Sequence, residues 1–381
     1  MAHEFDCIVV GAGSAGCAVA ARLSESGRHR VLLLEAGVRD TSPWIHLPMG
    51  FAKLFANPRI NWMFESEPEE ELNGRRLFQP RGKVLGGTSA INGMLYIRGN
   101  PADYDGWRQL GCEGWDWHSV LPYFRKSEDQ EHGADAFHGV GGPLRVSDQL
   151  YRWEVSEHFV AAAREAGIPT NPDFNGAEHE GAGFYQTTTR NGRRLSSAAA
   201  FLAPARGRAN LRVETGAQVT RVVIEGGRAT GVEFRSGDQI HLARARGEVV
   251  LCGGVFNSPQ VLQLSGVGPQ EMLRRFGIPV IHDSPAVGAN MQDHFYVLMV
   301  FRCQGLPTLN ELALSLPRQA LAAVQYGLLR RGPLTGHGLN AGLFVKSDPR
   351  LDRPDLQINL SAGSTLARNQ DGLTVHPFPA F

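Results

Sequence analysis

Apolar and polar positions divide the first part of the chain into a strand, a helix and a second strand. Residues 5–10 form an apolar run, and residues 31–34 form another that ends in an acidic residue, Glu35. Between them lies a glycine-rich turn, followed by an alanine-rich stretch that we expect to be helical and to end near Gly27. This order of elements is the βαβ arrangement typical of dinucleotide binding.

The turn after the first strand has the spacing GxGxxG. Gly11 would form the tight turn, Gly13 would let the backbone approach a pyrophosphate, and Gly16 would let the helix pack closely on the strand. A helix that begins near Ser14 directs free N–H groups at a phosphate. Glu35 would accept hydrogen bonds from both hydroxyls of an adenosine ribose. Because an acid there disfavours a 2′-phosphate, these residues predict FAD or NAD rather than NADP.

Further along, the patterns predict a strand meander and a second strand–glycine–helix unit. The meander covers residues 211–243, with glycine-containing hairpin turns. Residues 248–252 form an apolar strand that ends in two glycines, and Pro259 is expected to start a helix with Ser258 as its N-cap. Two such units separated by a meander favour a FAD-type domain over a plain NAD domain.

The length of 381 residues favours two domains. An amphipathic helix is expected over residues 153–166. Beyond residue 295 the pattern changes to a long helix over 312–331 and strands near 343–346 and 355–359. We expect these last elements to belong to the second domain.

Composition argues against several classes of function. Lys plus Arg and Asp plus Glu both number 38, so the formal charge is zero and no basic stripe points to nucleic acid. No apolar run approaches the roughly 18 residues of a membrane span, and the first strand starts too early to follow a signal peptide. The five cysteines are scattered without CxxC spacing, which predicts neither a metal site nor a disulfide framework. These features favour a cytoplasmic protein.

Several well-separated blocks of the chain carry a family pattern. Residues 82–92 read GKVLGGTSAIN, and residues 254–268 read GVFNSPQVLQLSGVG. Residues 290–294, 330–334 and 354–357 add NMQDH, RRGPL and PDLQ. Together these blocks resemble the glucose–methanol–choline (GMC) oxidoreductase family along essentially the whole chain. The pattern is most similar to that of bacterial choline-dehydrogenase-like and alcohol-dehydrogenase-like members.

The resemblance implies an α/β fold class, α+β overall. It predicts a Rossmann-like FAD-binding domain of the GMC type and a smaller, incomplete substrate domain built on an antiparallel sheet. We expect the FAD-binding domain to be discontinuous, covering residues 1–154 and 193–297. The substrate domain would cover residues 155–192 and 298–381.

The resemblance also implies chemistry. An enzyme of this family oxidises the CH–OH group of a small-molecule alcohol by hydride transfer to flavin N5, while a base removes the hydroxyl proton. Oxygen, a quinone and a redox protein all remain open as the electron acceptor. Ile91 stands where members with a covalent flavin carry histidine. We therefore expect FAD to be bound non-covalently.

Cofactor contacts are predicted by the resemblance and by the GxGxxG turn together with Glu35. By resemblance, Val84 and the backbone of residues 92–95 line the isoalloxazine, and Val219 touches the adenine side through its main chain. The amide of Asn92 would bind the ring or cap the following segment. The predicted cofactor-binding residues are Gly11, Gly13, Ser14, Ala15, Gly16, Glu35, Ala36, Trp62, Gly82, Val84, Gly87, Ser89, Asn92, Gly93, Met94, Leu95 and Val219.

No catalytic residue is assigned. The family's catalytic pair, a His followed by a His or Asn, lies in its last stretch of chain, and no similar block precedes Phe381. We therefore expect this chain to lack the family's C-terminal segment. His294 falls where the family has a structural residue, and His46 and His337 are expected to be surface or loop residues.

Three alternatives stay open at this point. The same scaffold can carry lyase or decarboxylase chemistry. A chain without the terminal catalytic histidine could instead be an impaired or non-catalytic flavin-binding module. A plain NAD dehydrogenase is disfavoured by the block at residues 82–92.

Overall fold

The computed structural model describes residues 3–381, which form two compact units. Unit 1 comprises the described residues through Thr41 together with Asn57–Ile91 and Ser196–Val297, and unit 2 comprises Ser42–Ala56, Asn92–Leu195 and Leu298–Phe381. These units differ from the expected domain bounds chiefly at residues 42–56 and 92–154, which belong to unit 2. Unit 2 is therefore not the smaller of the two.

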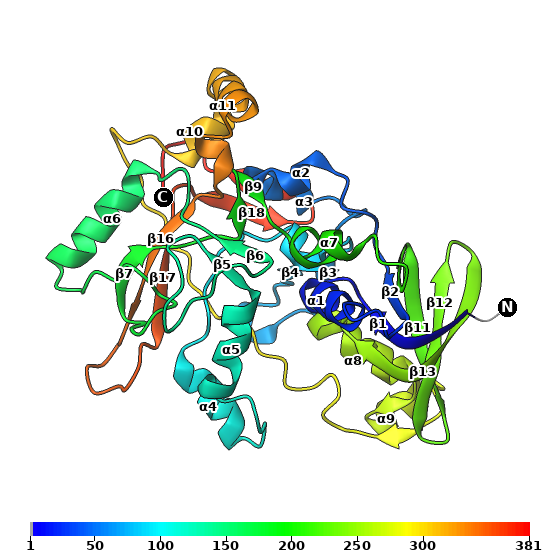
Figure 1. Ribbon diagram of the computed structural model, residues 1–381. Coiled ribbons are helices and arrows are strands. Elements are labelled where there is room, and N and C mark those ends of the chain that lie inside the picture. The colour runs from blue at the N-terminus through cyan, green and yellow to red at the C-terminus, as the bar shows by residue number, and fades with distance from the viewer. Residues whose placement is uncertain (1–2) are drawn as a thin grey trace. The chain divides into compact units, whose positions relative to one another are not determined.

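Unit 1 contains an open mixed sheet, short helices and a small hairpin (Figure 1). Its elements are β1 His3–Val10, α1 Ser14–Leu23, β2 Val31–Glu35, β3 Phe64–Glu65, η2 Glu70–Leu72, β4 Phe78–Gln79, η3 Gly87–Ala90, η4 Ala198–Leu202, α7 Ala203–Ala205, β10 Leu211–Thr215, β11 Ala217–Glu225, β12 Arg228–Ser236, β13 Gln239–Leu251, α8 Gly254–Leu264, β14 Val267–Gly268, α9 Gln270–Arg275 and β15 His282–Asp283.

The main sheet of unit 1 has six strands in the order β10-β2-β1-β13-β12-β11. Strands β10, β2, β1 and β13 pair in parallel, whereas β11, β12 and β13 form an antiparallel meander. The parallel part contains the βαβ crossover that the sequence predicts, so the α/β fold class is confirmed. The last strand of the expected meander and the strand expected at 248–252 form one strand, β13, which follows β1 across a register shift between Phe5 and Cys7.

Packing on both faces explains the apolar runs of the parallel strands. Ile8 and Val10 lie in a core cluster with Val261 of α8, whereas Val9 lies in a second cluster with Ala20 of α1. Alternate residues of a strand point to opposite faces. Because both faces are covered, β2 is buried along its whole length.

The helix expected to begin at Pro259 begins earlier, at Gly254. Strand β13 ends at Leu251, and Gly254 has φ +80°, so Gly253 and Gly254 make the turn into the helix. Pro259 lies inside α8 and costs it one backbone hydrogen bond. The expected N-cap at Ser258 was therefore wrong.

Unit 2 contains a three-stranded antiparallel sheet of order β17-β16-β7, as the resemblance predicts. Its elements are α2 Pro43–His46, η1 Pro48–Gly50, α3 Phe51–Leu54, α4 Pro101–Gln109, α5 Trp117–Ser127, β5 Glu128–Gln130, β6 Leu144–Val146, α6 Glu154–Glu165, β7 Gly181–Phe184, β8 Thr189–Arg190, β9 Arg193–Arg194, α10 Leu309–Leu314, α11 Leu316–Leu329, η5 Pro333–Thr335, β16 Leu339–Val345, β17 Leu356–Ser361, β18 Thr365–Asn369 and β19 Gly372–Val375.

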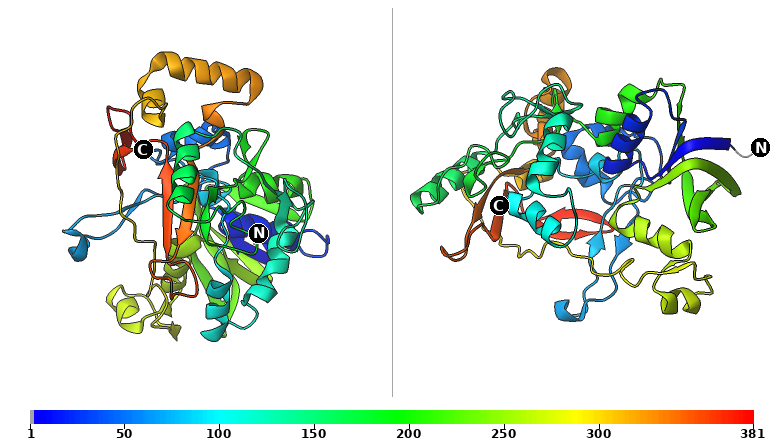
Figure 2. Two further views of the ribbon diagram at one scale, coloured as in Figure 1. Left: turned by 90° about the vertical axis from the view of Figure 1, so that its left-hand side faces the viewer. Right: turned by 60° about the horizontal axis from the view of Figure 1, so that its bottom comes forward.

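The long helix expected over 312–331 is divided into α10 and α11. Ser315 separates them with an extended backbone, and its side chain accepts a hydrogen bond from Arg318 N at the start of α11. Pro317 occupies the first turn of α11, where its missing N–H costs nothing. Figure 2 shows α11 projecting from the three-stranded sheet of the same unit. Among residues 3–381, no helix has both the length and the apolar character needed to cross a bilayer.

Candidate cofactor site

A cavity of about 540 Å³ opens in unit 1 at the carboxyl ends of the parallel strands. Its lining includes Val10, Leu34 and Leu251, which lie at or next to the ends of β1, β2 and β13. Ligands of open α/β sheets bind at this edge. The predicted residues in the lining are Gly11, Gly13, Ser14, Ala15, Glu35, Ala36, Trp62, Gly82, Gly87 and Val219.

The first turn of α1 presents open backbone to this cavity. Helix α1 begins at Ser14 after Gly13, and no side chain of residues 3–381 caps it. A Cβ built on Gly13 would have no neighbour nearer than 4.0 Å, whereas one on Gly16 would lie 1.8 Å from the Gly11 carbonyl oxygen. Gly13 therefore has room for a ligand beside its backbone, with the nearest neighbours of its Cβ position at 4.0 Å, and Gly16 packs against the end of the strand. Uncapped N–H groups at this end attract an anionic ligand.

Glu35 ends β2 with its carboxylate enclosed. One oxygen accepts a hydrogen bond from Ala12 N and the other from Gly37 N, both at 2.8 Å. Burial raises the pKa of Glu35 to about 7, although these two N–H groups and the Lys83 charge act in the opposite direction. Because a carboxylate has about four lone-pair positions, the two oxygens can each accept a further hydrogen bond from a ribose hydroxyl.

The glycine-rich turn at residues 82–89 packs against the start of α1. Gly86 N donates to Ala12 O at 2.8 Å. Gly87 has φ +53°, and a Cβ there would lie 2.6 Å from Gly13 Cα. Only glycine allows this approach of two backbones. The turn therefore forms a second wall beside the open backbone of Gly13.

Three predicted residues of unit 1 lie outside the cavity lining. Gly16 is occupied by helix packing, and Val84 is fully buried. Ser89 donates to Gly86 O at 2.6 Å and accepts from Ser197 N at 2.9 Å, so its hydroxyl holds the turn. These three residues support the site rather than facing its interior.

Four predicted residues, Asn92, Gly93, Met94 and Leu95, belong to unit 2. The Asn92 side-chain oxygen accepts hydrogen bonds from Met94 N at 3.1 Å and from Arg194 Nη1 at 2.8 Å. Met94 has φ +63°, which the Asn92 bond stabilises. Of the two roles expected for the Asn92 amide, this geometry provides the capping of the following segment. Flavin contact by these four residues stays a prediction.

Sequence reasoning missed part of the cavity lining. The first turn of α8 contributes Gly254, Val255, Phe256 and Asn257, and the hairpin contributes Arg81. The sequence predicts the second strand–glycine–helix unit but assigns no cofactor contact to it. Its apolar strand indicates a parallel neighbour of the first strand, and parallel strands end at the same edge of a sheet. The start of α8 could therefore have been predicted to lie beside the first glycine turn.

His337 lies in the loop between η5 and β16, but its side chain is buried and not at the surface. Burial lowers its pKa to about 3. Its Nδ1 accepts a hydrogen bond from Leu339 N at 3.2 Å, and its ring lies beside Gly93. Its Nε2 has no hydrogen-bond partner among residues 3–381. His294, by contrast, is exposed.

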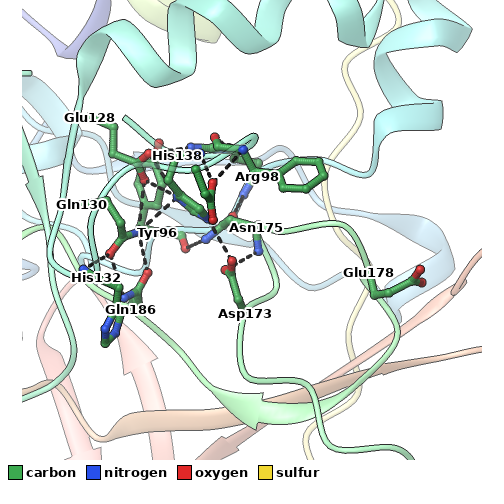
Figure 3. Close-up of polar contacts among 12 residues, drawn as sticks. Tyr96, Arg98, Glu128, Gln130, His132, His138, Asp173, Asn175, Glu178 and Gln186 are labelled. Atoms are coloured by element: carbon green, nitrogen blue, oxygen red, sulfur yellow. Dashed lines mark hydrogen bonds and ion pairs between the residues drawn. The ribbon is translucent and has the colours of Figure 1, made fainter. Parts of the chain in front are cut away.

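A buried polar network in unit 2 is a second cluster of titratable groups (Figure 3). Glu128 pairs with Arg98 at 2.9 Å and with His138 at 3.1 Å, and His138 also contacts Asp173 at 2.8 Å. Burial alone would lower the pKa of His138, but hydrogen bonds to Asp173 and Glu128 raise it to about 9. Each of these charges has an opposite charge beside it. We therefore interpret the network as a polar core that fixes its segments.

Comparison of this chain with known proteins identifies its family. The model of the GMC oxidoreductase family matches residues 5–296. The chain belongs to the GMC oxidoreductase family. This GMC oxidoreductase is 44% identical to the alcohol dehydrogenase [acceptor] of Pseudomonas putida over 93% of the chain and 65% of the relative. It is 42% identical to the mitochondrial choline dehydrogenase of Mus musculus over 93% of the chain and 61% of the relative.

A solved structure of an FAD-dependent oxidoreductase from Chaetomium thermophilum matches with a TM-score of 0.81 at 29% identity. That match covers 89% of this chain and 61% of the other. The chain thus spans about 61–65% of the length of these three proteins. FAD is the cofactor of this GMC oxidoreductase, and the cavity fits its adenosine diphosphate part. Open backbone at Gly13, the uncapped start of α1 and the buried Glu35 carboxylate supply the groups that such a ligand needs.

Proposed function

We propose that this GMC oxidoreductase oxidises the CH–OH group of a small-molecule alcohol. The observation that carries the proposal is the dinucleotide cavity of unit 1 in a family whose similar members are named alcohol and choline dehydrogenases. FAD, when bound, supplies a flavin that takes a hydride from the alcohol carbon. The electron acceptor stays open between oxygen, a quinone and a redox protein.

Different residues of this chain would hold different parts of FAD. Backbone N–H groups of Ser14 and Ala15 bind and orient the pyrophosphate, while Glu35 accepts hydrogen bonds from the ribose hydroxyls. The main chain at Val219 borders the adenine end. In this proposal unit 1 is the FAD-binding domain, and unit 2 carries substrate groups together with the isoalloxazine contacts at residues 92–95.

Non-covalent binding of FAD is part of this proposal. Ile91 is buried and its hydrocarbon side chain cannot form a bond to the flavin. Denaturation of the purified protein should therefore release the yellow colour into the filtrate. A cytoplasmic location is also proposed, because all five cysteines carry free thiols.

An anaerobic absorbance scan tests the proposed reaction. Purified protein loaded with FAD is mixed with choline, an aliphatic primary alcohol and an aromatic alcohol in turn. Loss of the visible flavin band with one of them supports alcohol oxidation and identifies the substrate class. Turnover without flavin reduction would indicate lyase chemistry instead. Protein that holds FAD and is never reduced by any alcohol would be a binding module.

A further inference from the structure

Five side chains of unit 1 form a continuous stack on the wall of the cofactor cavity. The Lys83 ammonium lies 4.6 Å from the centre of the Trp62 ring, which is parallel to Phe64 at 5.6 Å. Phe64 meets the ring of Phe256 edge to face at 5.3 Å, and the Arg81 guanidinium lies 4.9 Å from Phe256. Below, these five residues are called the aromatic stack. All but Lys83 line the cavity.

The backbone is shaped to make this stack. Met63, between the two parallel rings, has φ +57°, an uncommon conformation for a residue other than glycine. The buried Asn61 side chain holds it, accepting hydrogen bonds from Met63 N at 3.1 Å and from Arg81 N at 3.0 Å. Trp62 N donates to Arg81 O at 2.9 Å. Such strain persists only where its surroundings fix it, and it often marks a functional position.

The aromatic stack joins two parts of the chain that are far apart in sequence. Phe64 lies in β3 of the hairpin, three other members lie just outside the hairpin, and Phe256 lies in the first turn of α8. Its rings are half-buried, so they have surface left for a ligand. Its ends are cationic, and Arg81 lies in the lining of a cavity whose cofactor carries a pyrophosphate. An aromatic wall with cations suits an anionic, partly aromatic ligand.

We propose that the aromatic stack retains FAD in the cavity and sets the rate at which the cofactor dissociates. Its members are positioning residues, since they act on cofactor binding and not on the reacting atoms. The rings keep the hairpin against α8, and the two cations offset the charge of the pyrophosphate. FAD would leave only after the contact between Phe256 and its two neighbours opens.

Phe256→Ala tests the proposal most directly, because Phe256 contacts both Phe64 and Arg81. We expect the dissociation rate of FAD to rise about tenfold, as expected for the loss of one aromatic pair and one cation–π contact. The rate is measured from flavin fluorescence after rapid dilution of the loaded protein. Phe276→Ala is the matched control, since Phe276 is 68% exposed in the same unit, and it should leave the rate unchanged.

Arg81→Met tests the charge separately. It keeps the length of the side chain but removes its charge, so the dissociation rate should rise and depend less on salt. Arg76→Met is its control, because Arg76 lies in the same hairpin and pairs with Glu67. Trp62→Phe keeps a ring for Lys83 and Phe64 and should retain nearly the original rate.

Two outcomes would overturn the inference. An unchanged dissociation rate in folded Phe256→Ala would show that the aromatic stack does not retain FAD. If that variant does not fold, Phe256→Leu keeps an apolar side chain of similar bulk without a ring, and an unchanged rate there has the same meaning. An original protein that never binds FAD would instead remove the cofactor assignment itself, and with it the proposed function.

Discussion

At the scale of single residues, Glu35 shows how a binding group is held ready. Its two oxygens are fixed by backbone N–H groups of Ala12 and Gly37. Burial makes the charged form costly, so its pKa is raised to about 7. A ligand that brings hydroxyl donors to this carboxylate would stabilise the charged form. The residue therefore couples cofactor binding to pH.

Glu35→Gln tests this coupling. A raised pKa stabilises the folded protein below about pH 4.5, and this contribution is lost as pH rises through about 7. The loss is roughly 3 kcal/mol by the size of the shift. As pH rises from 4.5 to 8, the free energy of unfolding of the Glu35→Gln apoprotein should therefore increase relative to that of the original protein, as measured by urea unfolding.

The same substitution should weaken FAD binding about tenfold or more at pH 8, because a charged acceptor of the ribose hydroxyls is lost. Titration of the apoprotein with FAD measures the affinity. Glu71→Gln, an exposed carboxylate of the same unit, should change neither property. Equal pH dependence of stability in the original protein and in Glu35→Gln would contradict this account.

At the scale of elements, the cavity depends on a close approach of two glycine-containing turns. The turn at residues 82–89 meets the start of α1, where Gly87 and Gly13 lie backbone to backbone. Glycine spacing predicted both turns, because only glycine adopts these conformations without strain. Their contact follows from the sheet, which brings the end of β1 to this edge.

Gly87→Ala should separate these two turns. The new Cβ would lie 2.6 Å from Gly13 Cα, in a conformation that costs alanine about 1–2 kcal/mol. We expect FAD affinity to fall at least tenfold, measured by quenching of flavin fluorescence. Gly226→Ala is the control, since Gly226 has φ +59° but nothing within 4 Å of its Cβ position. Gly226→Ala should cost only the stability lost to its backbone conformation and leave affinity unchanged, and equal affinity losses would refute the contact argument.

At the scale of the whole molecule, two units with separate cores divide the predicted cofactor contacts. Unit 1 contains the glycine turn of residues 11–16, Glu35 and Val219, whereas unit 2 contains Asn92–Leu95. A ligand that binds only the folded protein slows local opening wherever it makes contact. Hydrogen exchange with and without FAD can therefore test the contacts of each unit in the same protein.

We expect FAD to slow exchange at residues 11–15 and 217–219 of unit 1. The slowing should reach up to about 100-fold at an FAD concentration of about 100 times Kd. Slowing at residues 92–95 would support the predicted isoalloxazine contact. Residues 339–345 of β16 serve as the reference in unit 2. Unchanged exchange at 92–95 beside a protected unit 1 would remove those residues from the site.

The sequence by itself determined the βαβ unit, its glycine turn and Glu35, because side-chain periodicity and glycine sterics act within a few residues. The family blocks determined FAD. Only the tertiary structure decided that Phe256 and Arg81 share one cavity wall, that His337 is buried and that residues 92–154 join unit 2. These features depend on contacts between segments far apart in the chain, and local sequence patterns do not predict such contacts.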